Sequence, residues 1–251
     1  MFKSGLKYKL KAVNAHGIHS PFVFTFYNEV LKKTARSKKD NIEALRKTLL
    51  NDETEIEITD FGAGSRIHKS NKRKVKDIAK YALVSKKYGR LLNRIVEFYG
   101  LSNSLELGTS LGVGAAYLSA SGSKVTTLEG CEKIAAKAKI NLNQLGFSKV
   151  DLRVGEFNKS IEDLGNIQYD LIYIDGNHQE EPTIAYFEKF IEYAHNDTFI
   201  IFDDIRWSVG MERAWQKIIA SDKINVSIEL LRMGIVLKRK EQEKEHFILK
   251  F

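Results

Sequence analysis

The chain has 251 residues, 43% of them hydrophobic, so it can bury a substantial core. A single cysteine excludes an internal disulfide, and no apolar run suits a signal peptide or a membrane span, so we expect a cytoplasmic protein with no membrane partner. The formal net charge is +8, but residues 66–94 hold eleven Lys or Arg and one acid, a local +10, which leaves 8 − 10 = −2 for the rest.

Residues 1–100 are expected to form an N-terminal helical extension and basic lid, ahead of a catalytic domain over 101–251. Ser20-Pro21 is a typical helix start, and the apolar and aromatic side chains over 22–30 predict a helix that packs on the main domain or serves a homodimer. His16-Gly17-Ile18-His19 has no third ligand nearby, so a zinc site is not favoured.

Residues 56–65 resemble a strand that leads into a glycine turn, and they could be mistaken for a cofactor loop. The polar, basic stretch 68–76 argues against that interpretation, because the helix after such a loop needs an apolar face. The segment could instead lie over a pocket, with Asp60, Ser65 or Arg66 near a ligand, or it could be a simple turn.

Two charged helices are predicted on either side of this segment, over 32–51 and 75–99. Apolar side chains recur along one face of the second helix, which we expect to be buried. Its basic side chains are either a solvated face or a rim that attracts an anionic substrate.

From residue 104 onward, short apolar strands alternate with helical patterns, which predicts an α/β fold with a parallel sheet and helices on both faces. Strands are predicted at 104–107, 124–129, 150–154, 169–174 and 198–202. Helices are predicted at about 112–121, 131–145, 157–164, 180–194 and 207–220. An antiparallel hairpin, over 225–230 and 234–238, is expected to close the sheet edge.

The first of these strands runs into a glycine-rich turn within 104–114, which is typical of the entrance to a nucleotide pocket. Gly108 can adopt a backbone conformation that other residues avoid, and Gly112 leaves room for a ligand or for a closely packed helix. Thr109 and Ser110 add hydroxyl groups at a helix N-terminus, where free N–H groups point outward.

Further strand ends carry polar residues at the edge where such sheets bind ligands. Glu129 lies 21 residues after Gly108, where a carboxylate holds the two ribose hydroxyls of an adenosine cofactor. The Gly-Glu-Phe stretch over 155–157 suits an adenine ring, through backbone and aromatic contacts. Asp175 follows the strand over 169–174.

The last apolar strand before the hairpin ends in Asp203-Asp204. If it neighbours the strand that ends at Asp175, the two ends lie about 5 Å apart and three carboxylates converge. A hard divalent cation would compensate such a cluster, or else one Asp caps the next helix and the others face water. We expect Glu129 and these aspartates at opposite ends of one cleft.

These strand ends, together with the stretches 106–114 and 174–178, resemble the class I S-adenosylmethionine-dependent methyltransferases. Within that class, the chain looks most like the catechol O-methyltransferase-like and macrolide or cephamycin O-methyltransferase group. The resemblance covers about Leu91 to Lys238. It implies a Rossmann-like, doubly wound, seven-stranded sheet whose last strand is antiparallel.

The resemblance also implies ligands. S-adenosylmethionine would be bound by Glu106, Gly108, Thr109, Ser110, Gly112, Glu129, Gly130, Gly155, Glu156, Phe157 and Asp175. A divalent cation, Mg²⁺ or a similar ion, would be bound by Asp175, Asp203 and Asp204. Catechol-type enzymes often carry Asp-Asn where this chain has the last two.

The implied reaction is an in-line methyl transfer from the sulfonium to an oxygen of a small hydroxylated molecule, with the cation positioning that oxygen. His178 is the candidate general base, because its unperturbed pKa lies near neutrality. Alternatively, it orients Asp175 or lines the pocket. Trp207 could form a wall for an acceptor ring, whereas Trp215 suits the core.

Two other function classes stay open. The basic segment 66–94 would suit an RNA-directed methyltransferase, which predicts a nucleic-acid affinity that falls steeply with salt. A nicotinamide-dependent dehydrogenase shares the glycine turn and the acidic strand end. It is disfavoured because Gly108-x-x-x-Gly112-x-Gly114 departs from the G-x-G-x-x-G pattern.

Overall fold

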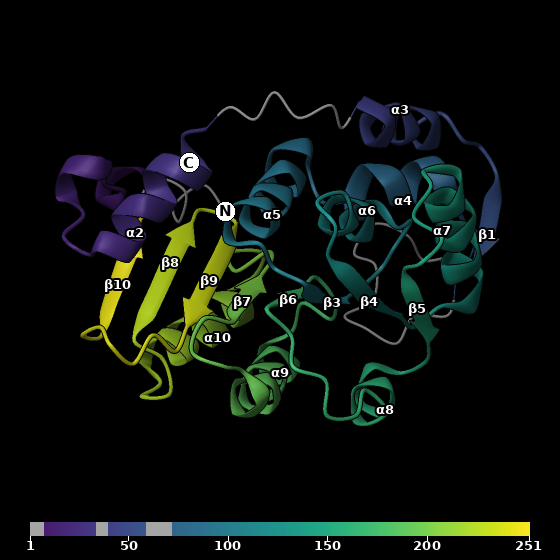
Figure 1. Cartoon of the computed structure of the whole chain (residues 1–251). Coiled ribbons are helices and arrows are strands. Elements are labelled where there is room, and N and C mark those ends of the chain that lie inside the picture. The colour runs from purple at the N-terminus through teal and green to yellow at the C-terminus, as the bar shows by residue number, and fades with distance from the viewer. Residues whose placement is uncertain (1–7, 34–39, 59–71) are drawn as a thin grey trace. The chain divides into compact units, whose positions relative to one another are not determined.

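The computed structural model describes residues 8–33, 40–58 and 72–251, and it has an α/β fold (Figure 1). The chain divides into two compact units, Met1–Thr34 with Gln168–Phe251, and Ala35–Ile167. Each unit contains parallel strands and helices, so the predicted fold class is confirmed. The predicted boundary at residue 100 concerns function rather than compactness, and it stays a prediction.

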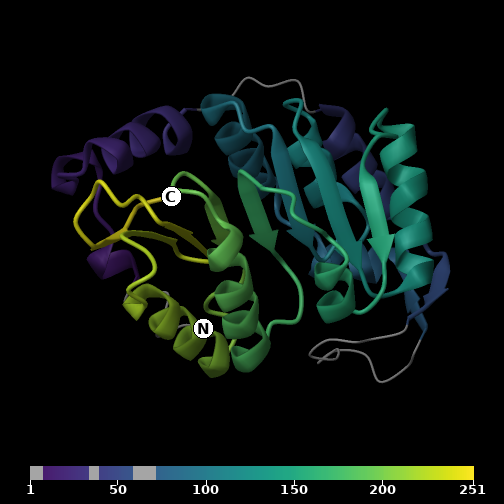
Figure 2. The ribbon, with the colours of Figure 1, turned by 60° about the horizontal axis from the view of Figure 1, so that its bottom comes forward.

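The unit of residues 35–167 contains three parallel strands side by side, in the order β3-β4-β5 (Figure 2). The strands are β3 (Asn103–Leu107), β4 (Lys124–Glu129) and β5 (Asp151–Val154). The helices that follow them are α6 (Val113–Ser119), α7 (Glu132–Gln144) and α8 (Phe157–Glu162). Leu107 pairs with Leu128, and Glu129 pairs with Val154, so the carboxyl ends of the three strands lie at one edge.

The first part of this unit is largely helical. Its elements are α3 (Asp40–Leu49), β1 (Glu55–Glu57), β2 (Lys72–Lys74), α4 (Val75–Ala82) and α5 (Lys86–Tyr99). The prediction of one helix over 75–99 is wrong, because the chain turns at 83–85. Leu83 and Val84 are buried there, and the Arg46 guanidinium donates to the Val84 carbonyl at 2.7 Å.

Two other predictions for this region have mixed outcomes. The helix predicted over 32–51 is present over Asp40–Leu49, and residues 34–39 lie outside the described part of the chain. The strand predicted near residue 56 is present as β1. Its antiparallel partner β2 was not predicted, because its sequence Lys-Arg-Lys has no apolar alternation.

The other unit contains five strands in the order β10-β8-β9-β7-β6. They are β6 (Leu171–Ile174), β7 (Phe199–Phe202), β8 (Val226–Leu230), β9 (Met233–Leu237) and β10 (Glu245–Ile248). Its long helices are α9 (Glu180–Tyr193) and α10 (Val209–Ala220). Every residue of β6 to β9 is buried, as is typical of strands covered on both faces.

The predicted hairpin is confirmed, since β8 and β9 pair antiparallel, and β9 is also antiparallel to β7. The hairpin does not close the edge, however. β10 pairs parallel with β8 and occupies the edge. Among the described residues, the strands from β3 to β10 therefore number eight, one more than the predicted seven. In β10 only Phe247 is fully buried, and such a short pattern gives little signal in a sequence.

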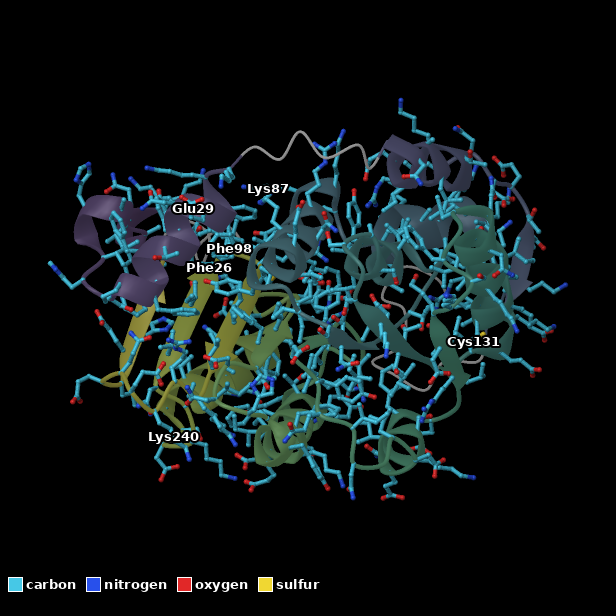
Figure 3. All side chains as sticks on the ribbon, viewed as in Figure 1. Phe26, Glu29, Lys87, Phe98, Cys131 and Lys240 are labelled. Atoms are coloured by element: carbon cyan, nitrogen blue, oxygen red, sulfur yellow. The ribbon has the colours of Figure 1, made fainter. Side chains whose placement is uncertain are left out.

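The N-terminal helix begins where the sequence predicts. The Ser20 hydroxyl accepts a hydrogen bond from the Val23 N–H, and the helical segments are η1 (Ala15–Gly17), α2 (Pro21–Thr25) and η2 (Phe26–Leu31). Phe22 and Phe26 lie with their ring centroids 6.2 and 6.4 Å from that of Phe199. Figure 3 labels Phe26. This end of the chain therefore packs on β7, as expected. Within the described residues, no helix is both long and apolar enough to cross a bilayer.

Candidate functional site

The glycine turn between β3 and α6, residues 108–112, is called the cofactor loop below. Gly108 has φ +101° and Gly112 has φ +86°, so both need the conformational freedom expected of them. The N–H groups of Gly108 and Thr109 donate to the Leu128 carbonyl at 3.0 and 3.1 Å. These two bonds attach the loop to the end of β4.

Gly112 also allows a close approach between two helices. A Cβ at this position would lie 3.1 Å from Leu142 and 3.3 Å from the Ala138 carbonyl, both on α7. The room that Gly112 leaves is thus used by the protein's own helix. The sequence allowed room for a ligand or for a helix close to the strand. The neighbour in the structure is α7, and a contact of Gly112 with the cofactor stays a prediction.

Glu129, at the end of β4, closes the cofactor loop. Its carboxylate accepts hydrogen bonds from the N–H groups of Ser110 at 2.9 Å and Cys131 at 3.0 Å, and its carbonyl accepts the Gly155 N–H at 3.0 Å. Cys131 is buried at the start of α7 (Figure 3). A carboxylate offers about four acceptor positions, so these bonds are compatible with a ribose diol as a further partner.

Ser110 is the residue of the loop best placed for a ligand. Its backbone is held at φ +48°, in the left-handed region that a serine rarely adopts. Among the described residues, its buried Oγ has no hydrogen-bond partner. A buried polar atom without a partner in a strained turn is a feature that a bound cofactor would satisfy.

Glu106 and Thr109 face the interior instead, with exposures of 1% and 2%. The Thr127 hydroxyl donates to Glu106 at 2.6 Å and lies 2.7 Å from the Thr109 hydroxyl. Burial raises the pKa of Glu106 to about 8, so this carboxyl is protonated at neutral pH. Both side chains thus have partners within the chain, and their predicted contacts with the cofactor stay a prediction.

The remaining cofactor residues of this unit follow strands at the same edge. Gly130 is half-buried beside Glu129, Glu156 is exposed, and Phe157 is half-buried at the start of α8. Gly155 joins β5 to them. Their contacts with an adenine ring stay a prediction. Asp60, Ser65 and Arg66 lie outside the described residues, so the predicted loop over the pocket is not described.

In the other unit, the predicted neighbours at two strand ends are confirmed. Ile174 pairs with Phe202, and the Asp203 N–H donates to the Ile174 carbonyl at 3.0 Å. Asp175, Asp203 and Asp204, called the acid cluster below, therefore follow adjacent strands. The Tyr173 hydroxyl lies 3.0 Å from Asp175 Oδ2 and 2.9 Å from Asp203 Oδ2, and so joins two of them.

Arg232 lies in the turn between β8 and β9, and its contact with the acid cluster was not predicted from the sequence. Its Nε lies 2.8 Å from Asp203 Oδ1 and 2.9 Å from Asp204 Oδ1. The strand register could have revealed it. Gly234 pairs with Phe202 in the antiparallel pair of β9 and β7. Counting back from Gly234 and forward from Phe202 places Arg232 opposite Asp204. That argument requires β9 to lie next to β7, which local periodicity does not reveal.

The acid cluster does not fit a divalent cation as it stands. The described residues contain no group of three or more His, Cys, Asp or Glu side chains arranged to hold a metal ion. Arg232 already compensates Asp203 and Asp204. The predicted Mg²⁺ at Asp175, Asp203 and Asp204 is thus without support, and we derive no step through it.

Burial and mutual repulsion set the protonation of the cluster. They raise the pKa of Asp175 well above its ordinary value, through burial first and then the charges of Asp203 and Asp204. They raise the pKa of Asp204 to about 6. A tyrosine hydroxyl has one proton, so Tyr173 can bond to both Asp175 and Asp203 only if one carboxyl is itself protonated. The raised pKa of Asp175 favours the proton on that carboxyl.

His178, the candidate general base, lies beside the cluster. Its Nε2 is 3.7 Å from Asp175 Oδ1, which is too long for a hydrogen bond. Burial lowers the pKa of His178, and the charge of Arg232 lowers it further, against the opposing effect of Asp203. The imidazole is therefore neutral at pH 7 and can accept a proton, as a base must.

The two tryptophans differ as the sequence predicts. Trp215 is buried, donates to Glu229 at 3.1 Å, and packs so closely on Gly234 that a Cβ there would lie 2.5 Å from its ring. Trp207 is 37% exposed after β7. A role for Trp207 as a wall of an acceptor site stays a prediction.

The cofactor loop and the acid cluster belong to different compact units. The expected single cleft between Glu129 and the aspartates therefore stays a prediction. Within each unit the geometry is defined: one holds a strained, partly unsatisfied glycine turn, and the other holds three carboxyls, a neutral imidazole and a guanidinium.

Comparison with known proteins finds a matching domain in part of the chain. Residues 105–205 match the family model described as "Methyltransferase domain", a stretch that includes the cofactor loop and the whole acid cluster. A protein-L-isoaspartate O-methyltransferase of Methanococcus maripaludis is 37% identical over 90 residues, which cover 35% of this chain and 41% of the relative. The chain thus spans about two fifths of the length of this relative.

Solved structures share the fold at low identity. An O-methyltransferase from Bacillus cereus, in complex with SAH, is 22% identical with a TM-score of 0.59 and covers 82% of this chain and 94% of its own. A putative caffeoyl-CoA O-methyltransferase from Staphylococcus aureus is 19% identical with a TM-score of 0.56, covering 64% and 88%. These structures show the fold that the sequence predicts, and the family model shows a match to a methyltransferase domain over residues 105–205.

Proposed function

We propose that the chain is an S-adenosylmethionine-dependent O-methyltransferase that methylates a hydroxyl group of a small molecule. The observation that carries the proposal is the cofactor loop closed by Glu129, in a segment that matches a methyltransferase domain. The O-methyltransferases among the similar structures support oxygen as the acceptor atom. A carboxyl acceptor is the second candidate, on the printed name of the Methanococcus relative.

The chain's own residues would act by binding, positioning and proton transfer. When bound, S-adenosylmethionine supplies a methyl group on a positively charged sulfur. Ser110 Oγ and the Glu129 carboxylate would hold its polar groups, and neutral His178 would accept the proton of the acceptor hydroxyl. The raised pKa of Asp175 and the pairing of Asp203 with Arg232 would limit the negative charge around His178.

The two other functions that the sequence left open, an RNA-directed methyltransferase and a dehydrogenase, have less support. Within the basic segment, Lys74 lies 2.9 Å from Glu53, and Lys76 pairs with the same carboxylate. Part of the charge that would attract RNA is thus neutralised locally, at exposed pairs whose individual contribution to stability is small. A dehydrogenase has no support from the methyltransferase match.

Isothermal calorimetry tests the cofactor. S-adenosylhomocysteine should bind the full chain, and NAD should not. Glu129→Ala should weaken that binding at least about tenfold, because it removes a charged hydrogen-bond acceptor from the loop. Glu132→Ala, an exposed neighbour on α7, is the matched control and should bind normally. Tight binding of NAD in place of S-adenosylhomocysteine would refute the proposal.

The acceptor is found by incubating the protein with S-adenosylmethionine and a panel of phenols, catechols, aliphatic alcohols, carboxylic acids and RNA, with mass spectrometry of the products. A mass gain of one methyl group on a hydroxyl compound supports the O-methyltransferase proposal. Methylation confined to carboxylic acids would favour the second candidate, and methylation confined to RNA would favour the nucleic-acid alternative.

A further inference from the structure

We infer that the guanidinium of Arg232 is a built-in cation of the acid cluster and that this chain needs no divalent metal ion there. The inference rests on the methyltransferase function proposed above. It concerns residues that the sequence pattern assigns to a metal, but that the structure joins to an arginine.

Arg232 engages all four carboxylate oxygens of Asp203 and Asp204. Nε lies 2.8 and 2.9 Å from the Oδ1 atoms of Asp203 and Asp204, and Nη2 lies 3.2 and 3.3 Å from their Oδ2 atoms. Mg²⁺ would need oxygens of these same groups at about 2.0 to 2.1 Å. The ion and the guanidinium therefore compete for one set of oxygens.

The third carboxyl is also engaged. Asp175 Oδ2 lies 3.0 Å from the Tyr173 hydroxyl, which lies 2.9 Å from Asp203 Oδ2. The three acids thus form one network through a guanidinium and a phenol. In this network each carboxyl already has a partner from the chain, so the cluster does not depend on an added ion.

The fold holds Arg232 in this place by its backbone. The Arg232 N–H donates to the Leu230 carbonyl at 2.8 Å, and the Arg232 carbonyl accepts the Ile205 N–H at 2.9 Å. Leu231, in the tight turn between the strands, has φ +63°. The register of β9 on β7 then sets Arg232 beside the residues that follow Phe202. The sheet therefore places the backbone of Arg232 beside the acid cluster.

Charge and burial favour a permanent cation. The Asp203 side chain is fully buried, and a buried carboxylate without a counter-charge is strongly unfavourable. The Arg232 side chain is 34% exposed. Among the described residues, Nη1 of Arg232 has no hydrogen-bond partner, and its two N–H groups can donate to an acceptor oxygen.

Manganese titration of the full chain, followed by electron paramagnetic resonance, tests the inference without needing an acceptor. The wild-type protein should leave Mn²⁺ unbound at concentrations up to about 1 mM, which is the dissociation constant of the weakest protein sites for such hard cations. Arg232→Met removes the guanidinium and keeps a side chain of similar length. It should bind Mn²⁺ at least about tenfold more tightly than the wild type, since its carboxylates are uncompensated, and Mg²⁺ should raise its Tm.

Two variants serve as controls. Arg232→Lys keeps the positive charge and should gain no metal binding. Arg213→Met removes an exposed arginine of the same unit that pairs with Glu180, and it should behave like the wild type. A simple loss of stability in Arg232→Met would not create dependence on a divalent ion, so the Mg²⁺-dependent Tm separates the inferred role from a merely structural one.

Wild-type binding of Mn²⁺ well below 1 mM that Asp203→Asn abolishes would overturn the inference. So would an Arg232→Met variant that folds but gains no metal binding. If that variant does not fold, the wild-type titration still decides. Failure of the wild-type protein to bind S-adenosylhomocysteine would refute the proposed function instead. Calorimetry measures that binding separately from any metal.

Discussion

At the scale of single residues, two glutamates at the ends of neighbouring strands show how environment sets the role of a side chain. Glu106 on β3 is buried, and its pKa is raised to about 8. Glu129 on β4 is half-buried and accepts two backbone N–H groups. Both were predicted to bind the cofactor. Glu129 thus holds the backbone of the cofactor loop, and the contact of either glutamate with the cofactor stays a prediction.

The burial of Glu106 predicts a pH effect on stability. Its pKa is about 8 in the folded state against an ordinary value of 4.5, so between these values the folded protein keeps a proton that the unfolded chain releases. Stability must therefore fall as pH rises through that window, by up to about 1.4 kcal/mol per pH unit from this group. Glu106→Gln, which cannot ionise, should flatten the decline.

Urea denaturation at intervals from pH 5 to 9 measures the effect. Glu106→Gln should gain stability relative to the wild type as pH rises, with the largest gain near pH 8 and above. Glu162→Gln, an exposed glutamate on α8, is the control and should follow the wild type. Parallel curves for Glu106→Gln and the wild type would contradict a buried, protonated carboxyl.

At the scale of elements, the cofactor loop depends on how α7 packs. Gly112 begins α6 with φ +86°, and Leu142 and the Ala138 carbonyl lie close to the place where a Cβ would be. The loop is thus shaped by a helix that follows it by about twenty residues in sequence. Gly122, after α6, has a similar φ of +93° but nothing within 4 Å of such a Cβ.

The two glycines make a matched pair for mutation. Gly122→Ala should cost about 1 kcal/mol in the free energy of unfolding, because only the backbone is strained. Gly112→Ala should cost about 2 to 4 kcal/mol, because Leu142 and α7 must also shift. Urea denaturation of both variants gives the difference. Equal costs would mean that α7 does not restrict the loop.

At the scale of the whole molecule, the methyltransferase match runs through sequence from both compact units. Residues 105–167 belong to one unit and 168–205 to the other. Cofactor residues were predicted in both, since Asp175 lies outside the unit that holds the cofactor loop. A method that reports on every segment at once is therefore the suitable test.

Hydrogen exchange with and without S-adenosylhomocysteine is that method. Peptides covering 108–114, 129–131 and 155–157 should become protected, since their backbone N–H groups surround the predicted ribose and adenine contacts. Protection near Asp175 would support the predicted contribution of the second unit. Protection of 59–71 would support a loop over the pocket, and unchanged exchange there would favour the simple turn. No protection at 108–114 would contradict the cofactor loop.

The sequence by itself determined the features that depend on neighbouring residues. The alternation of strands and helices, the glycine turn at 108–112, the helix start at Ser20 and the hairpin before Lys238 follow from local periodicity and backbone preference. The acids at adjacent strand ends could also be predicted from the sequence, because the carboxyl ends of parallel strands lie at one edge of a sheet.

Only the tertiary structure decided the features that depend on distant residues. Arg232 reaches Asp203 and Asp204 because β9 pairs with β7. The chain turns at 83–85, where Leu83 and Val84 are buried. Glu106 is protonated because its burial in the core outweighs the opposing effect of the Thr127 hydrogen bond on its pKa. Such contacts join residues far apart in the chain, and their energies depend on packing and dielectric surroundings that no local pattern encodes.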